Sequence, residues 1–411
     1  MGQKMHVLRV ARRMLLAAAL SALLLLAACQ SSPEAPAANP TATEPPAPTE
    51  APPSPTTEPT ASATPELEAT ATAAATAQPT ATAVPQETET QAAPEAVFAP
   101  VGEGPVVPHG EPGSWDGQYT DPGAVVYHDG AFHMFHNGFV GWPAPVGIAY
   151  SSSPDGYEWT RVQDDPVFVG DDLDYVGLTA LASSALVQDD GTWVLYFYTW
   201  DDRVWPGSTS SIGRATAPDP LGPWTADPEP VLVSGPEASW DQEAVRTPSV
   251  LRTDDGYVMF YAGFDGQNGM IGMATSEDGV QWSKYDDAAT TDAPFAESDP
   301  IFLPGPEDAW DAGNVFHPRV VQSPDGYVMA YSAAPRLNVT STIGYAVSQD
   351  GLDWQRAPEP VLQFGDVPGG RAIWFSALAY HDGTYFLFFE LGTGGQTEVY
   401  LATHDGSLPA P

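Results

Sequence analysis

The sequence repeats itself five times after about residue 97, with a period of about sixty residues. Each copy carries an Asp-Gly pair between an apolar run and an alternating run rich in aromatic residues. Such a pattern is typical of a β-hairpin whose tight turn needs residues that tolerate a positive φ. The five pairs are Asp129-Gly130, Asp190-Gly191, Asp255-Gly256, Asp325-Gly326 and Asp382-Gly383.

Two more strands are expected in each copy. The third strand corresponds to segments such as "IGMATSE" and "IGYAVSQ", and it leads into a turn of the form "SEDGVQW". Asp bonds the backbone of such a turn and Gly supplies its positive φ. A fourth strand then begins at or near Trp159, Trp224, Trp282 or Trp354. Four antiparallel strands in each of five copies predict an all-β fold, a five-bladed β-propeller over residues 97–411.

The ring is expected to be closed by chain that precedes the first copy. The last copy stops after its third strand, at Asp405-Gly406, whereas "PVVPHGEPGSWD" at 105–116 has the pattern of the connections "PVLVSGPEASWD" and "PIFLPGPEDAWD". Val106 and Val107 are therefore predicted to form the outer strand of the last blade, which leaves fewer exposed sheet edges. We interpret the recurring Trp-Asp pairs of these connections as structural.

The first 29 residues have the pattern of a signal peptide. A basic head precedes an apolar stretch, Leu15 to Leu26, that is short for a membrane span. The stretch ends in "LAAC", which resembles the lipobox of bacterial lipoproteins and makes Cys29 the expected lipidation site. An ordinary secretory signal is the alternative. The lipoprotein interpretation places the protein outside the cytoplasm, lipid-anchored at the bacterial cell surface.

Residues 30–96 are rich in Pro, Thr, Ala and Glu and are predicted to form a disordered linker, because they lack the apolar surface that would offset ordering entropy. The chain has 53 acidic and 14 basic residues and a formal net charge of −39. This charge repels nucleic acid and anionic lipid, so the expected membrane contact is the lipid anchor alone. We expect a monomer and no cofactor; a structural calcium ion is left open.

The blade motifs resemble those of the furanosidase-type propellers, the clan of glycoside hydrolase families 43, 32, 62 and 68 with the related family 130 phosphorylases. The resemblance rests on five copies, on inner strands that open with X-Pro, and on "A-x-S-x-D-G-x-x-W" turns between residues 103 and 406. It implies a carboxylate base or nucleophile in an Asp-Pro motif at the first inner strand. Asp121-Pro122 matches that motif.

The other acids of these families have no direct match. The resemblance implies a blade-two aspartate, where this chain has Ala182, and a blade-three glutamate in Glu-x-Pro, where it has Arg246 before Pro248. Glycoside cleavage needs a second carboxyl group about 5–10 Å from the first. Glu243, just before Arg246, and Glu390, at the end of the second strand of blade five, are the candidates for the general acid.

Cationic and aromatic residues near the expected axis are candidates for substrate binding. Arg246, His317 and Arg319 open inner strands, and this expected cationic trio can bind sugar hydroxyls, a uronate or phosphate, or neutralise the acids in a structural network. Trp374 and Trp142 offer flat rings for a sugar face. No histidine spacing indicates a metal site.

Three functions remain open from the sequence. The leading one is a surface-anchored glycosidase of the family 43 and 32 type that acts on terminal sugars of oligo- or polysaccharides. The alternatives are a glycan-binding propeller lipoprotein without catalysis and a glycoside phosphorylase of the family 130 type. The distance from Asp121 to Glu243 or Glu390 separates catalysis from binding alone.

Overall fold

The computed structural model describes residues 96–201, 209–335, 342–363, 365–367, 370 and 372–411. The predicted signal peptide, with Cys29, and nearly all of the predicted linker lie outside these ranges. Across the ranges that are described, no helix is long and apolar enough to cross a membrane.

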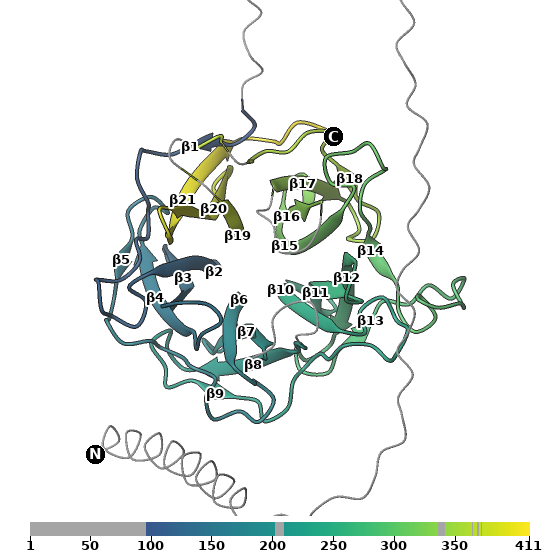
Figure 1. Cartoon of the computed structure of the whole chain (residues 1–411), viewed down its shortest axis with the longest axis horizontal. Helices are drawn as coiled ribbons and strands as arrows, with labels where there is room; N and C mark the ends of the chain where they lie inside the picture. Colours follow the sequence, from purple (N-terminus) through teal and green to yellow (C-terminus); the bar gives the residue numbers. More distant parts are fainter. Residues whose placement is uncertain (1–95, 202–208, 336–341, 364, 368–369, 371) are drawn as a thin grey trace, which may run out of the picture. The chain divides into compact units, whose positions relative to one another are not determined.

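The described strands form antiparallel groups around a central axis, with β2, β6, β10, β15 and β19 innermost (Figure 1). The expected all-β propeller fold is confirmed. Blade one contains β2 (Tyr119–His128), β3 (Ala131–Phe139), β4 (Gly147–Ser153) and β5 (Thr160–Arg161). Blade two contains β6 (Thr179–Val187), β7 (Trp193–Trp200), β8 (Ile212–Ala217) and β9 (Thr225–Ala226).

The other three groups follow the same order from the axis outward. Blade three contains β10 (Ala244–Thr253), β11 (Gly256–Phe264), β12 (Gly269–Ser276), β13 (Ser283–Lys284) and β14 (Pro300–Phe302). Blade four contains β15 (Asn314–Ser323), β16 (Gly326–Ala334), β17 (Thr342–Ser348) and β18 (Gln355–Arg356). Blade five contains β19 (Ala372–His381), β20 (Thr384–Thr393) and β21 (Gln396–Asp405), and β1 (Ala99–Pro100) pairs with β21.

The Asp-Gly pairs lie at the hairpins between inner and middle strands; Asp129-Gly130 and Asp382-Gly383 form the two-residue turns of blades one and five, whereas Gly256 and Gly326 are the first residues of β11 and β16. At the first turn Asp129 and Gly130 have φ of 46° and 83°, and at the last Asp382 and Gly383 have φ of 49° and 84°. Two consecutive residues with positive φ match the twist of the flanking strands. The hairpins of blades one and five therefore hold their middle strands in register with the inner strands, His128 opposite Ala131 and His381 opposite Thr384.

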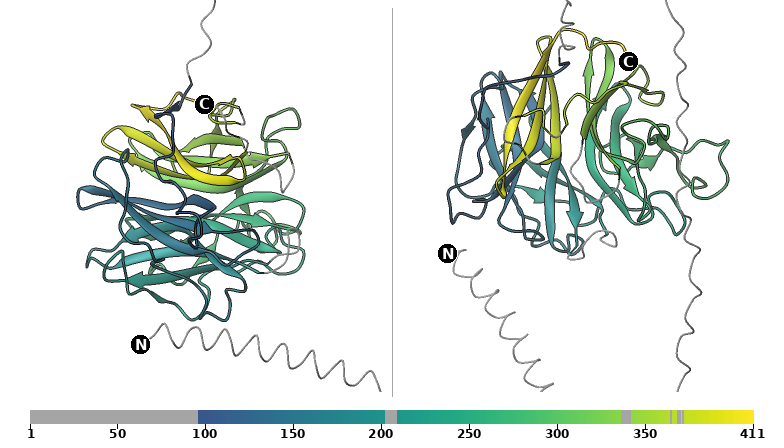
Figure 2. Two further views of the ribbon diagram at one scale, coloured as in Figure 1. Left: turned by 60° about the vertical axis from the view of Figure 1, so that its left-hand side comes forward. Right: turned by 45° about the horizontal axis from the view of Figure 1, so that its top comes forward.

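Chain that precedes the first blade closes the ring. Val106 N–H donates to Val399 O at 2.8 Å, and Val399 N–H donates to Val107 O at 2.9 Å. Further upstream Ala99 pairs with Thr403, and Phe98 is buried in the core of blades four and five. Figure 2 shows the yellow strands of blade five beside the blue N-terminal segment. The predicted role of Val106 and Val107 is confirmed.

The Trp-Asp pairs hold blade junctions together, as the sequence indicated. Each aspartate is almost completely buried, and each receives a cation from the outermost strand of the blade that follows it. The ion pairs are Asp116 with Arg161, Asp241 with Lys284, and Asp311 with Arg356. A buried carboxylate needs such a partner, because desolvation of an unpaired charge is costly.

Candidate active site

All five inner strands carry a bulge near the axis, and in β6 the register shifts between Ala182 and Ser184. The register shifts between Asp121 and Ala124 in β2 and at the corresponding places in β10, β15 and β19. Two residues of the inner strand then face one residue of the middle strand. In β10 and β15 the first bulge residue, Thr247 or His317, has a φ of 49° or 53°. A positive φ in these residues is strained, and such strain clusters at functional sites.

Asp121 lies at the bulge of β2 and is 2% exposed. Asn137, its partner on β3, donates from Nδ2 to Asp121 Oδ1 at 2.8 Å. The same amide accepts a hydrogen bond from Ala182 N–H at 2.7 Å, which ties Asp121 to blade two. Asp121 Oδ2 has no hydrogen-bond partner among the described residues. Burial raises the pKa of Asp121 to about 7, against the opposing effects of the Asn137 hydrogen bond and the Arg319 charge.

Glu390 lies on β20, opposite the bulge of β19, and is 3% exposed. Burial raises the pKa of Glu390 well above its usual value, and the charge of Asp121 raises it further. Hydrogen bonds from the Thr397 side chain and the Phe375 backbone act in the opposite direction. Within the described part of the chain, Glu390 Oε2 lacks a hydrogen-bond partner. The fold thus brings Asp121 and Glu390 into electrostatic contact at the axis.

Arg319 crosses the axis and joins three blades. From β15 its Nε donates to Ser376 O at 2.5 Å, and its Nη1 donates to Ser183 O at 2.8 Å and to the Ser183 hydroxyl. Burial lowers the pKa of Arg319 to about 10, and the charges of Tyr198 and Asp121 oppose that shift. The guanidinium is therefore charged at neutral pH and is the cation that acts on Asp121.

Arg246 and Glu243 belong to a neighbouring cluster. The Arg246 guanidinium lies 3.7 Å from the centre of the Trp200 ring and 5.5 Å from that of Phe264. Burial lowers the pKa of Arg246 to about 9, while the charges of Tyr198, Glu243 and Asp201 raise it. The charge of Glu243 thus acts on Arg246, whereas the charge of Asp121 acts on Glu390.

His317 is neutral in this environment. Burial, and then the charge of Arg319, lower the pKa of His317 to about 3. Its ring stacks on Phe375 at 4.6 Å and meets Phe316 edge-on. The cationic trio expected from the sequence is therefore reduced to two arginines, because a buried imidazole beside a guanidinium releases its proton.

The two candidate tryptophans lie in different surroundings. Trp374 is half-buried in the bulge of β19, directly opposite Glu390. Trp142 is 48% exposed and contacts Phe139 and Trp200, with ring centres 5.5 and 5.3 Å apart. Through Trp200 it adjoins Arg246, so Trp142 offers an accessible aromatic face next to the buried cluster.

Sequence reasoning missed Asn137, Ser183 and Tyr198. Tyr198 is almost completely buried, and burial followed by the charge of Asp121 raises its pKa far above the usual value. Its position in an apolar strand made it indistinguishable from a core aromatic. Asn137 did carry a signal, because it is an amide in a strand where alternate residues are apolar.

Comparisons with known proteins point to propeller glycoside hydrolases. Residues 114–298, a little under half of the chain, match the model described as glycosyl hydrolases family 32 N-terminal domain. The match covers blades one and two and blade three as far as β13, with Asp121 and Glu243 but without Glu390. No curated protein matches the chain.

Solved structures resemble the chain along most of its length. One comes from work on the GH130 family of mannoside phosphorylases, described as containing glycoside hydrolases that target beta-1,2 mannosidic linkages in Candida mannan. It is 19% identical, has a TM-score of 0.57, and the alignment covers 77% of this chain and 96% of that one. A glycosyl hydrolase from Bacteroides ovatus has 18% identity, the same TM-score and coverages of 77% and 95%. A protein from Parabacteroides distasonis ATCC 8503, described as a glycoside hydrolase, has 18% identity, a TM-score of 0.57 and coverages of 77% and 98%.

These structural likenesses establish a shared fold. The resemblance to the propeller glycoside hydrolases that the blade motifs indicated is confirmed. The family 32 match over residues 114–298 is the likeness to a glycosyl hydrolase at the level of sequence.

Proposed function

We propose that the protein is a glycoside hydrolase that acts on terminal sugars of oligo- or polysaccharides, with Asp121 and Glu390 as its catalytic pair. One observation carries the proposal: two buried carboxyl groups interact at the ring axis, and each keeps one oxygen without a hydrogen-bond partner among the described residues. Asp311 Oδ1, in a structural ion pair, also lacks a partner among the described residues, so what distinguishes Asp121 and Glu390 is that two such carboxyl groups interact at the axis.

The two carboxyl groups differ in the way that glycoside cleavage requires. Burial raises the pKa of Asp121 to about 7, and burial together with the charge of Asp121 raises the pKa of Glu390, so ionisation of Asp121 favours the protonated form of Glu390. Glu390 gives that proton to the glycosidic oxygen while the bond from this oxygen to the anomeric carbon breaks. The Asp121 carboxylate either bonds to that carbon or takes a proton from the attacking water. Two carboxyl groups with separated pKa values are the usual mark of such a pair.

The surrounding residues support these roles. Asn137 fixes the orientation of the Asp121 carboxylate through a single hydrogen bond and leaves Oδ2 available. Arg319 favours the ionised form of Asp121, and its bonds to Ser376 and Ser183 hold its guanidinium in place. The exposed ring of Trp142 is a surface on which a sugar can stack.

The test is sugar release from a panel of aryl arabinofuranosides, xylosides, fructosides and mannosides, with β-1,2-linked mannobiose included because of the GH130 neighbour. Wild-type protein is expected to release sugar from at least one substrate, and Asp121→Asn to abolish release while circular dichroism and melting stay unchanged. Full activity in Asp121→Asn would contradict the proposal. Turnover only in the presence of inorganic phosphate would identify a phosphorylase instead.

A glycan-binding protein without catalysis is the second candidate. It is favoured by the near-complete burial of Asp121 and Glu390 and by Arg246, which occupies the place of the Glu-x-Pro acid and stacks on Trp200. It predicts saturable binding on a glycan array without turnover, weakened by Trp142→Ala. Sugar release by the wild type would exclude it.

The proposed location is the bacterial cell surface, where a lipid on Cys29 holds a monomeric propeller at the end of the linker 30–96. The proposal is supported by "LAAC" directly after the apolar stretch. Metabolic labelling with a palmitate analogue is expected to mark the wild type but not Cys29→Ser. A labelled Cys29→Ser protein would contradict the anchor.

A further inference from the structure

Three blade junctions are built on the same parts but differ in the side chain beside the cation. Each contains a Trp-Asp pair with its cation, and each follows a residue that bridges the outer edge of the preceding blade. That bridging residue is Leu232 before Asp241, Phe302 before Asp311, and Val107 before Asp116. The smallest of the three therefore lies at the junction where blade five meets blade one.

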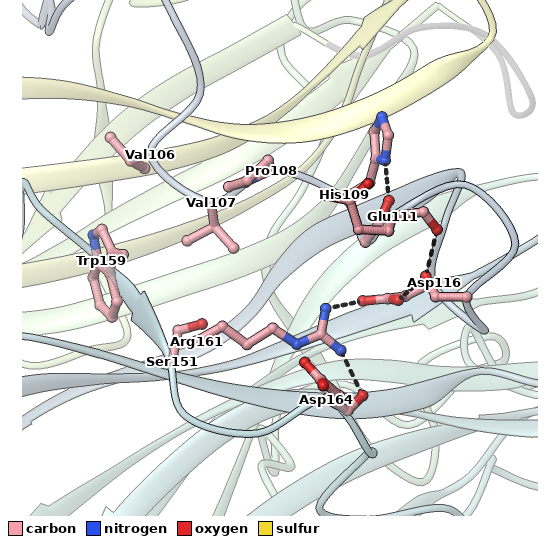
Figure 3. Close-up of a pocket in the computed structure, with 12 residues that line it drawn as sticks. Val106, Val107, Pro108, His109, Glu111, Asp116, Ser151, Trp159, Arg161 and Asp164 are labelled. Carbon is pink, nitrogen blue, oxygen red and sulfur yellow. Dashed lines mark hydrogen bonds and ion pairs between the residues drawn. The ribbon is translucent and has the colours of Figure 1, made fainter.

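The smaller side chain leaves space beside the cation. Before blade four, the guanidinium of Arg356 packs over the ring of Phe302 at 4.3 Å. The corresponding Arg161 has Val107 in that place, and a cavity of about 430 Å³ lies beside it. The cavity, here called the seam pocket, is lined by Val107, His109, Glu111, Asp116, Trp159 and Arg161 among others (Figure 3). This volume is within the range of small-ligand sites.

The lining favours a neutral polar ligand. Arg161 is 25% exposed, pairs with Asp116 and donates from Nη2 to Asp164 O at 3.0 Å, so its charge is already compensated. The lining combines the guanidinium of Arg161 with the carboxylates of Glu111, Asp116 and Asp164, in a chain whose net charge of −39 repels free anions. A ligand that both donates and accepts hydrogen bonds meets this lining without leaving an uncompensated charge.

An aromatic face completes the lining. Trp159 is partly buried, with its Nε1 bound to Gly156 O at 2.9 Å and its ring edge-on to Phe388. Figure 3 shows Trp159 across the pocket from the Arg161 and Asp116 pair. An aromatic ring opposite planar hydrogen-bonding groups suits a ring with apolar faces and a polar rim, which describes a sugar.

We propose that the seam pocket is a second carbohydrate-binding site that takes one or two sugar units of a neutral glycan. Its lining comes from the closing segment around Val107 and from the outer strands of blade one, so it uses none of the axial residues. Binding here retains a glycan on the protein without hydrolysis, and it is independent of the catalytic role proposed for Asp121.

The test replaces Val107 by phenylalanine, the residue found at the corresponding position, Phe302, of the junction before blade four, so that the new ring fills the pocket. Xylobiose, mannobiose and arabinobiose are titrated by saturation-transfer NMR and tryptophan fluorescence. The Val107→Phe variant is expected to keep or raise the melting temperature, because the new ring packs under Arg161 as Phe302 packs under Arg356, and to weaken binding about tenfold or more. Arg161→Lys, which copies Lys284, is expected to weaken binding as well, whereas Arg252→Lys on a distant surface leaves it unchanged.

Two controls decide the outcome. Asp121→Asn removes an axial carboxylate, so binding that survives Asp121→Asn but not Val107→Phe supports the seam pocket. Binding that is equal in Val107→Phe and wild type overturns the proposal, as does a failure of all three disaccharides to bind at millimolar concentration. If Val107→Phe does not fold, Arg161→Lys against Arg252→Lys gives the same decision.

Discussion

The carboxyl group of Asp121 on β2 raises the pKa of the carboxyl group of Glu390 on β20, although the two residues lie in the first and the last blade. Blade five is joined to blade one directly, where Tyr119 of β2 pairs with Thr397 of β21, and through the closing segment that pairs with β21. Ring closure and the candidate catalytic pair are therefore linked: a ring open at this seam has no fixed distance between the two acids.

The identity of the general acid is tested by two matched substitutions. Glu390→Gln removes a protonated carboxyl group beside Asp121, and sugar release is expected to fall by about 10²–10⁴-fold. Glu243→Gln alters the group that acts on Arg246 and is expected to cost less. Both variants are assayed on aryl glycosides with good and poor leaving groups. A larger loss of activity in Glu243→Gln than in Glu390→Gln would identify Glu243, next to blade three, as the general acid.

Activity is expected to rise with pH through the pKa of Asp121. The base or nucleophile must be ionised, and burial sets this pKa at about 7. Below pH 7 kcat/KM then falls about tenfold per pH unit. At higher pH it falls again when Glu390, whose pKa is raised further by the Asp121 charge, loses its proton. A profile that is flat between pH 5 and pH 7 would show that Asp121 is not the ionising group.

Burial of Asp121 also makes the fold less stable as pH rises. Its pKa is about 7 in the folded chain against the ordinary 3.8, so between these values the folded state holds a proton that the unfolded state has released. The contribution of Asp121 to the free energy of unfolding has its highest value below pH 4. It declines as the pH rises toward 7, by on the order of 4 kcal/mol. Urea unfolding of wild type and Asp121→Asn at pH 4, 5.5 and 7 measures it. The stability difference is expected to shift in favour of Asp121→Asn with rising pH, and a constant difference would contradict the raised pKa.

Most of the fold could be predicted because its strands and turns depend on short sequence patterns, and the same patterns occur in all five copies of the repeat. Asp-Gly turns, alternating strands and Trp-bearing turns depend on neighbours in the chain, and their repetition makes each more certain. The closure by Val106 and Val107 could also be predicted, because the last copy of the repeat lacks a fourth strand and a segment with the pattern of such a strand precedes the first copy. The additional pairing of Ala99 with Thr403 could not be predicted, because two residues after a linker are too few to show a strand pattern.

The site was less predictable because it is made of single residues from different blades. Asp121 stood out by its departure from Thr247 and His317 in the repeat. Glu390 shows a comparable departure, since the corresponding residues opposite the bulges are His136, Tyr261 and Tyr331. What the sequence could not show is the electrostatics: His317 loses its proton only because burial and Arg319 act together on it.

The segment directly after the linker is expected to be essential for stability. Phe98 is 2% exposed and packs in the core shared by blades four and five. Phe98→Ala leaves a cavity there and is expected to lower the free energy of unfolding by about 3 kcal/mol or more. Glu103→Ala, on the exposed stretch that follows β1, is the control and is expected to change little. Equal unfolding midpoints for Phe98→Ala and wild type would show that the closing segment does not stabilise the ring.

The last prediction concerns Arg319, which holds three blades together and also acts on Asp121. Arg319→Met keeps much of the side-chain volume but leaves Ser376 O and Ser183 O without their donor in the buried centre. The free energy of unfolding is expected to fall by on the order of 3 kcal/mol, whereas Arg252→Met, which breaks an exposed pair with Asp189, has little effect.

Arg319→Met is also expected to move the pH profile, which a purely structural role would not do. Removal of the guanidinium deletes an interaction that lowers the pKa of Asp121, so this pKa rises above about 7. The rising limb of kcat/KM then shifts to higher pH in the variant. A variant that is destabilised but keeps the wild-type profile would separate Arg319 from Asp121 and leave it the single task of joining blades two, four and five.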